Sequence, residues 1–214
     1  NRAHSVEEAI RAVDRARAAC FEDLTIDLIY GIPISDTARW VQNLEQALVF
    51  QVPHISAYCL TIEPGTAFGN WAKKGKLQEA PDEVASEQFL IAVDTLEAAG
   101  YEHYEISNYA LPGRKAKHNS AYWAGVPYLG IGPAAHSFNG ENRQWNLANN
   151  MKYIKSVQSH PATAAIPDWV DTEILSAADK HNEYVMTRLR TSGGIVPEEL
   201  SAAYRQNFID AVQL

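Results

Sequence analysis

The sequence predicts an α/β fold, because short apolar segments alternate with amphipathic segments of helical length. Residues 24–30 form an apolar run, broken by Asp27 and one threonine, that is typical of a strand buried on both faces. Residues 37–50 carry apolar side chains at helical spacing, with Asp36 placed to cap the helix. Residues 54–62 have the composition of a second strand. Strand, helix and strand in this order predict a parallel crossover.

The remaining segments predict mainly helices around one loop-rich region. Ser5 and Glu8 have the spacing of a capping box, so we expect a helix over residues 5–20. Residues 101–109 are expected to be extended, and residues 110–146 to be turns and loops because they are rich in Gly, Pro and Asn. Further helices are predicted at residues 82–99, 149–159, 171–190 and 197–214.

Composition narrows the class of protein. The net charge of −8 and the lack of a long cationic run disfavour a general nucleic-acid surface. Cys20 and Cys59 are far apart and surrounded by apolar residues, so we expect two reduced, buried thiols, with neither a disulfide nor a cysteine metal site. No apolar run approaches the ~18 residues that a membrane span needs, and no signal peptide opens the sequence. We therefore expect a cytoplasmic protein without an integral membrane segment.

Several motifs then follow one another along most of the chain. They are DLIYGIP at 27–33, HISAY at 54–58, EPGT at 63–66, YEISN at 104–108, HNSAYW at 118–123 and YLGIGPAAHS at 128–137. In order and spacing they resemble the HemN/HemW family of radical S-adenosylmethionine (SAM) proteins, which are oxygen-independent coproporphyrinogen III oxidase-like. The HNxxYW pattern resembles the HemW branch in particular. The chain departs from the family pattern in two turns, at Cys20-Phe21 and at residues 34–36.

The resemblance implies an architecture and a division of the chain. It implies the C-terminal part of a partial radical SAM TIM-type barrel, followed by the start of a small helical C-terminal domain. Residues 1–66 would end the barrel, residues 67–170 would form a loop-rich region that completes barrel and cap, and residues 171–214 would begin the helical domain. The CxxxCxxC loop that ligates the 4Fe–4S cluster is expected upstream of Arg2, outside this chain.

The same resemblance assigns candidate residues for S-adenosylmethionine. Arg2, Asp27, Ile29 and Thr61 stand where family members contact this cofactor, because a carboxylate accepts ribose or amino hydrogens and a guanidinium pairs with a carboxylate. We expect Asp27 to point into the barrel interior, with Arg2 on the same side. The alternative is that Asp27 is a structural carboxylate held by a backbone or arginine partner.

His118 of the HNxxYW pattern is the candidate haem ligand, since imidazole is a common axial ligand of haem iron. The alternative is a histidine that only forms hydrogen bonds within its loop. Six aromatic residues could face a flat macrocycle or simply fill the core: Tyr101, Tyr104, Tyr109, Tyr122, Trp123 and Tyr128. His136 is expected in the core or in a cavity wall, and Asn108 and Asn119 are expected to organise loops.

Two functions stay open at this point. In one, an oxygen-independent coproporphyrinogen III oxidase-like enzyme uses S-adenosylmethionine and a 4Fe–4S cluster to decarboxylate a porphyrinogen. In the other, a haem chaperone binds haem and transfers it to a recipient protein without this activity. Catalytic residues and oligomeric state are not indicated, and this chain alone is expected to be inactive because it lacks the cluster cysteines.

Overall fold

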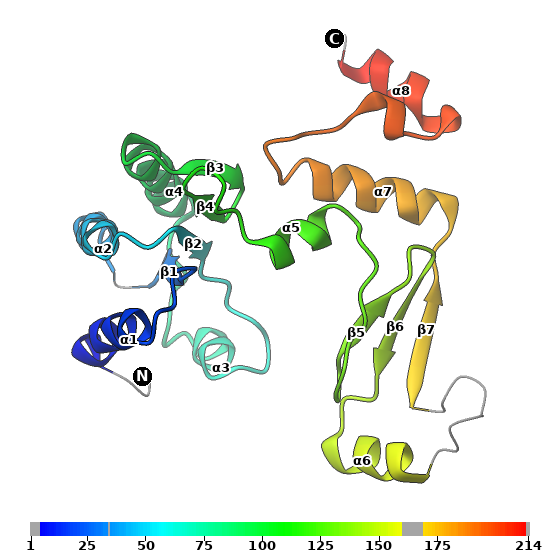
Figure 1. Cartoon of the computed structure of the whole chain (residues 1–214), viewed down its shortest axis with the longest axis horizontal. Coiled ribbons are helices and arrows are strands. Elements are labelled where there is room, and N and C mark those ends of the chain that lie inside the picture. Colours follow the sequence, from blue (N-terminus) through cyan, green and yellow to red (C-terminus); the bar gives the residue numbers. More distant parts are fainter. Residues whose placement is uncertain (1–4, 34, 160–168, 213–214) are drawn as a thin grey trace. The chain divides into compact units, whose positions relative to one another are not determined.

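The computed structural model describes residues 5–33, 35–159 and 169–212 (Figure 1). The chain divides into two compact units, Asn1–Ala116 and Lys117–Leu214. This division differs from the predicted segments 1–66, 67–170 and 171–214, which follow family boundaries rather than compactness and stay a prediction. No helix in the described ranges is both long enough and apolar enough to cross a bilayer.

The first unit contains a four-stranded sheet in the order β1-β2-β4-β3. Strands β1 (Thr25–Tyr30) and β2 (His54–Cys59) are parallel, and α2 (Thr37–Val49) connects them, which confirms the predicted crossover. Residues 101–109, expected to be extended, form two strands joined by a turn: β3 (Glu102–Glu105) is antiparallel to β4 (Asn108–Ala110), with an irregular register between His103 and Glu105. A turn between two short strands is hard to predict from a run of aromatic residues.

Two helices of the first unit begin at the capping residues that the sequence predicted. In α1 (Val6–Ala18), Ser5 and Glu8 form both hydrogen bonds of the predicted capping box. Asp36 caps α2 by accepting a hydrogen bond from the Arg39 amide at 2.8 Å. The long helix α4 (Asp82–Ala98) is also confirmed. A short helix that the sequence did not predict, α3 (Ala67–Lys73), begins after Thr66.

The core of the first unit lies between the sheet and its helices. Its members are apolar side chains from α2, β2 and α4, among them Leu44, Ile55 and Leu96, each with 0% exposure. Ile26 and Leu28 of β1 pack against this cluster. The sheet therefore buries one face against helices, and its opposite face carries alternate residues of each strand.

Two expectations about burial are wrong. Strand β1 is not buried on both faces, because Ile26 and Leu28 pack on the core while Thr25 and Asp27 on the opposite face are exposed. Cys20 and Cys59 are free thiols as expected, but both are exposed. Cys20 follows the end of α1 in a left-handed conformation (φ 64°), and Cys59 is the last residue of β2.

The second unit combines a three-stranded antiparallel sheet with helices. The sheet has the order β5-β6-β7, with β5 at His136–Phe138, β6 at Asn142–Asn146 and β7 at Val170–Ile174. Figure 1 shows α6 (Asn150–Ser159) at one end of this sheet and α7 (Ala177–Arg188) at the other. The unit also contains α5 (Lys117–Trp123), the 3₁₀ turn η1 (Pro197–Glu199) and α8 (Ala202–Val212).

The predicted start of α7 is wrong. Residues 171–174 were expected to be helical, but they belong to β7, which pairs with β6 along its whole length. The helix begins only after Ser176, whose hydroxyl accepts a hydrogen bond from the Asp179 amide in a second capping box. Pairing with a distant strand outweighs the local helical pattern here.

The loop-rich region 110–146 contains more regular structure than expected. Helix α5 and the β5–β6 hairpin both lie within it. Tyr128 pairs with Phe138 through two backbone hydrogen bonds of 2.8 and 2.9 Å. This pairing brings Gly130 so close to β5 that a Cβ atom there would lie 2.1 Å from the carbonyl oxygen of His136.

Candidate functional site

Polar side chains gather on the helix-free face of the sheet in the first unit. Asp27, Ser56 and Asn108 are aligned across β1, β2 and β4, and Glu105 of β3 pairs with Asn108. Residues in register on neighbouring strands point to the same face. The four strands therefore present a polar row, Asp27–Ser56–Asn108–Glu105, opposite the apolar core.

A hydrogen-bonded chain centred on His54 lies beside this row. The Nδ1 atom of His54 is 2.7 Å from the Thr25 hydroxyl, and its Nε2 atom is 2.7 Å from the Tyr104 hydroxyl. The Tyr104 oxygen also accepts a hydrogen bond from the Ala116 amide at 3.3 Å. Three strands are thus linked through one imidazole.

Burial sets the protonation of these groups. His54 is only 5% exposed, and this burial lowers its pKa, while the nearby charge of Asp27 opposes the shift. Burial likewise raises the pKa of Tyr104. A neutral imidazole between two hydroxyl groups is therefore the form that this site favours near neutral pH.

Glu105 and Asn108 form the buried end of the polar row. Both are 2% exposed. The Asn108 amide and the Ser107 backbone N–H donate hydrogen bonds to the Glu105 carboxylate. Asn108 therefore organises the turn, as its residue type predicted. Its Oδ1 atom has no hydrogen-bond partner within the described residues.

The residues predicted to bind S-adenosylmethionine are brought only partly together. Asp27 is exposed and Ile29 half-buried, and both lie on the helix-free face of β1. Thr61 is exposed in the loop that follows β2. Arg2 lies outside the described residues. Sequence reasoning missed His54 and its neighbours, although the alternation of polar and apolar residues along residues 54–58 marks a second, polar strand face.

In the second unit, His118 begins a row of aromatic rings. The exposed imidazole, in the first turn of α5, meets the Tyr122 ring edge-on at 4.8 Å. Tyr122 meets Tyr128 at 4.7 Å, and Tyr128 lies 6.2 Å from Phe138 of β5. The predicted aromatic set is thus divided, because Tyr101, Tyr104 and Tyr109 are buried in the first unit.

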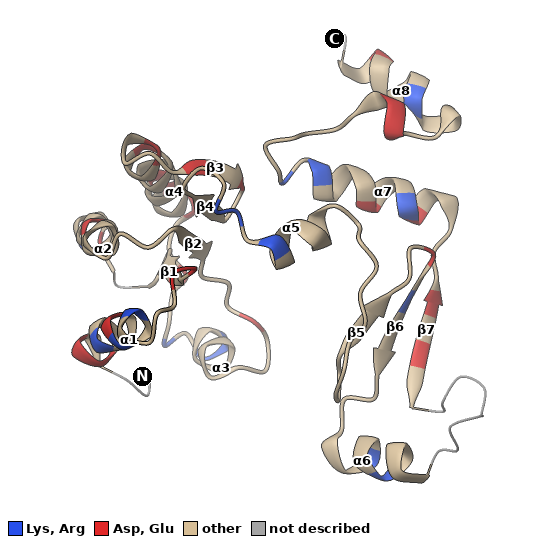
Figure 2. Ribbon diagram, in the orientation of Figure 1, with Lys and Arg blue, Asp and Glu red and all other residues tan. Residues whose placement is uncertain are grey.

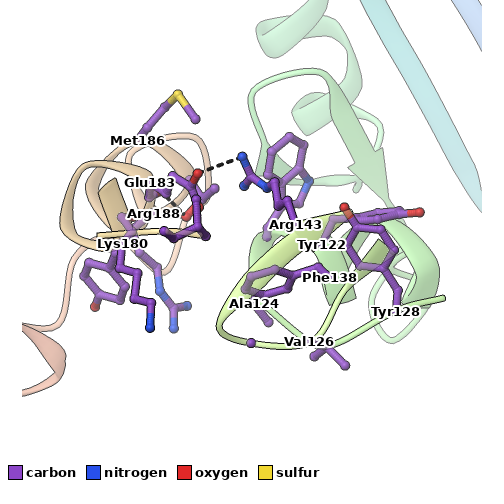
Figure 3. Close-up of a pocket in the computed structure, with 16 residues that line it drawn as sticks. Tyr122, Ala124, Val126, Tyr128, Phe138, Arg143, Lys180, Glu183, Met186 and Arg188 are labelled. Atoms are coloured by element: carbon purple, nitrogen blue, oxygen red, sulfur yellow. Dashed lines mark hydrogen bonds and ion pairs between the residues drawn. The ribbon is translucent and has the colours of Figure 1, made fainter. Parts of the chain in front are cut away.

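A cavity of about 380 Å³ adjoins this row (Figure 3). Tyr122, Tyr128 and Phe138 line one side, and α7 lines the other. Arg143 of β6 reaches Glu183 of α7 with a distance of 2.7 Å between nitrogen and oxygen.

Two charged residues of α7, Lys180 and Glu183, are only partly exposed. Lys180 forms an ion pair with Glu141, and Glu183 forms one with Arg143, so both connect α7 to the β5–β6 hairpin. His136 was expected in the core or in a cavity wall. It is exposed, with its ring 6.0 Å from that of Trp145.

Comparison with known proteins identifies related chains. No family model matches the sequence. The Mycobacterium tuberculosis protein "Heme chaperone HemW" is 34% identical over 206 residues, which cover 96% of this chain and 52% of that protein. The Bacillus subtilis and Synechocystis proteins of the same name are 31% and 37% identical over 95% and 94% of this chain. They are covered over 52% and 47% of their own lengths, so the chain spans about half the length of these curated relatives.

One solved structure has the same fold. The Escherichia coli coproporphyrinogen III oxidase HemN, described as a radical SAM enzyme, superposes with a TM-score of 0.73 at 18% sequence identity. The match covers 98% of this chain and 51% of HemN, which confirms the expected α/β fold of the radical SAM type. Sequence and fold agree: over about half of their lengths the chain is similar to the HemW proteins, and it shares the fold of the radical SAM enzyme HemN.

Proposed function

We propose that this chain is part of a HemW-like radical SAM protein that binds haem and transfers it to a recipient protein in the cytoplasm. The observation that carries the proposal is the exposed His118 at the head of an aromatic row, within a chain whose curated relatives are named haem chaperones. An accessible imidazole supplies an axial nitrogen to haem iron, and aromatic rings suit a flat apolar macrocycle.

The helix-free face of the first unit would hold S-adenosylmethionine. The Asp27 carboxylate is exposed there, and the buried Asn108 Oδ1 lacks a donor within the described residues, so both can accept hydrogens from a ribose or an amino group. Ile29 on the same face would contact the adenosyl group, and Thr61 and Arg2 would complete the site. This assignment rests on the family resemblance and on the polarity of the face.

A 4Fe–4S cluster does not fit the residues of this chain. Such a cluster needs at least three thiolates, and the sequence has only Cys20 and Cys59. The described residues contain no group of three or more His, Cys, Asp or Glu side chains that could hold a metal ion. The cluster of the family would therefore be held by cysteines other than these two.

The ligand role of His118 is tested by titrating haem into wild-type protein and the His118→Ala variant. We expect the variant to bind haem about tenfold or more weakly, with a shifted Soret band, because the iron loses a strong nitrogen donor. His136→Ala is the matched control, since His136 is another exposed histidine of the second unit. Identical spectra and affinities for wild type and His118→Ala would reject the proposal.

An activity assay separates chaperone from oxidase. A longer protein that contains this chain together with cluster-binding cysteines would be loaded with the cluster and incubated with coproporphyrinogen III, S-adenosylmethionine and a reductant. We expect no decarboxylated product, together with transfer of bound haem to an apo-haemoprotein. Formation of one vinyl group for each S-adenosylmethionine cleaved, and so of one divinyl product for every two, would favour the coproporphyrinogen oxidase instead.

A further inference from the structure

The cavity of the second unit has a cationic rim, although the chain carries a net charge of −8. Arg143, Lys180 and Arg188 line it, against the single carboxylate of Glu183. Two of these cations come from α7 and one from β6 (Figures 2 and 3). Each of these cations has a carboxylate partner, so an anionic ligand would bind at the rim by replacing such a partner.

The opposite wall of the cavity is aromatic. Tyr122, Tyr128 and Phe138 present their rings there (Figure 3). His118 precedes Tyr122 by four residues in α5, which places the two on the same face of the helix. The cavity therefore begins one helical turn beyond the candidate haem ligand.

We propose that this cavity receives the carboxylate-bearing edge of a tetrapyrrole, with the aromatic wall against the macrocycle and the cationic rim pairing with the propionates. The inference deepens the proposed haem function and rests on it for the identity of the ligand. A volume of about 380 Å³ suits one edge of the macrocycle, while the iron lies toward His118.

The cations of the rim are already paired, but their partners are exchangeable. Arg143 pairs with Glu183, Lys180 with Glu141, and Arg188 with Glu199. The paired side chains are from 24% to 73% exposed, and ion pairs of this kind contribute little because water and salt screen them. Inside the cavity, the attraction between a propionate and a cation is less screened by water and salt than it is in these exposed ion pairs. Each cation can therefore replace its glutamate partner with a propionate at a small cost in free energy.

The test uses metal-free protoporphyrin IX, which has both propionates but no iron. Its affinity is measured by quenching of tryptophan fluorescence, since Trp123 lines the cavity. We expect the variant Arg143→Gln/Lys180→Gln to bind about tenfold more weakly than wild type. Arg188 stays unchanged because its ion pair with Glu199 connects α7 to η1.

Two controls isolate the propionates. Lys152→Gln/Lys155→Gln removes the same charge from exposed positions on α6 and should leave affinity unchanged. The dimethyl ester of protoporphyrin IX should bind wild type about tenfold more weakly, with little further loss in Arg143→Gln/Lys180→Gln, because the same interaction is removed from either side. The proposal would be overturned if Lys152→Gln/Lys155→Gln lost as much affinity for protoporphyrin IX as Arg143→Gln/Lys180→Gln. It would also be overturned if the loss of affinity from the ester and the loss from Arg143→Gln/Lys180→Gln were additive.

Salt provides a second measurement that needs no variant. Affinity of the wild type for protoporphyrin IX should fall as ionic strength rises, while affinity for the ester should not. Equal salt dependence of the two ligands would also overturn the proposal. Failure of the haem-ligand role is distinguishable, because His118→Ala then leaves the haem spectrum unchanged while the porphyrin results stand.

Discussion

Among single residues, His54 has the most consequential environment. It joins Thr25 of β1 to Tyr104 of β3 through hydrogen bonds of 2.7 Å at each ring nitrogen. Removing the ring takes away one partner of the buried Tyr104 hydroxyl, and loss of a hydrogen bond to a buried polar group costs about 1–3 kcal/mol, whereas the exposed Thr25 can turn to water. His54, which lies next to the candidate cofactor face, therefore also stabilises the sheet by connecting β1 to β3.

Stability should depend on pH through His54. Burial lowers the pKa of His54 in the folded protein below its ordinary value of 6.5, so the unfolded chain takes up a proton first as the pH falls. The stabilisation that the neutral His54 ring contributes is therefore complete above pH 6.5, and it decreases as the pH falls from 6.5 toward the lower pKa of the folded protein. We expect the urea-unfolding free energy of wild type to decrease between pH 7.5 and 5.5.

The variant His54→Gln isolates this effect from the other histidines. Glutamine has no group that titrates in this range, so the loss of stability between pH 7.5 and 5.5 should be smaller in the variant. At pH 7.5 the variant should be less stable than wild type by about 1–2 kcal/mol. An equal pH dependence in both proteins would show that His54 is not the responsible group.

Some residues of the candidate sites could be predicted from the sequence, and others could not. Asp27, Ile29 and His118 were indicated by motifs that are contiguous in the chain. The network of His54 was not, because Thr25, His54 and Tyr104 are brought together only by pairing of β1, β2 and the hairpin β3–β4. The cavity beside α7 could not be predicted for the same reason, because its walls come from segments that are about 60 residues apart in the sequence.

At the level of elements, local signals predicted the three long helices of the first unit well, but missed the short helices α3 and α5 and the strands of the second unit. Capping residues and helical spacing depend on neighbours within four positions, so α1, α2 and α4 follow from sequence. Strand β7 depends on its pairing with β6, and its residues alone resemble the first turn of a helix. A short strand of this kind can be predicted only when the strand with which it pairs is known.

The cap of α2 offers an element-level prediction. Replacing Asp36 with Ala removes the acceptor for the Arg39 amide and should lower the free energy of unfolding by about 1 kcal/mol. Glu45→Ala serves as the control because Glu45 is exposed in the middle of the same helix. Chemical denaturation followed by circular dichroism measures both. A cost for Glu45→Ala as large as that for Asp36→Ala would contradict the capping role.

On the scale of the whole molecule, the first unit contains its own sheet and core. All four strands of the β1-β2-β4-β3 sheet and the helices that cover it lie within residues 1–116. We expect a chain of these residues to fold alone and to unfold cooperatively on heating. Trp40→Ala should destabilise it by about 3–5 kcal/mol, because Trp40 is only 2% exposed. A gradual, non-cooperative melt of the unsubstituted fragment would contradict this expectation.

The whole chain is also predicted to bind no iron–sulfur cluster by itself. Two cysteines cannot supply the thiolates that such a cluster requires. Anaerobic reconstitution with iron and sulfide, followed by desalting, should leave far less than one cluster per chain. Stoichiometric iron and sulfide in the desalted protein would contradict the prediction.

The close approach at Gly130 restricts which sequences this fold tolerates. A methyl group there would meet the backbone of His136 at 2.1 Å, and relief would require separating Tyr128 from Phe138. Those two rings also line the cavity, so a single added carbon atom would alter a ligand site that it does not touch. In a library randomised at codon 130 and selected for porphyrin binding, the recovered clones should therefore encode glycine almost without exception.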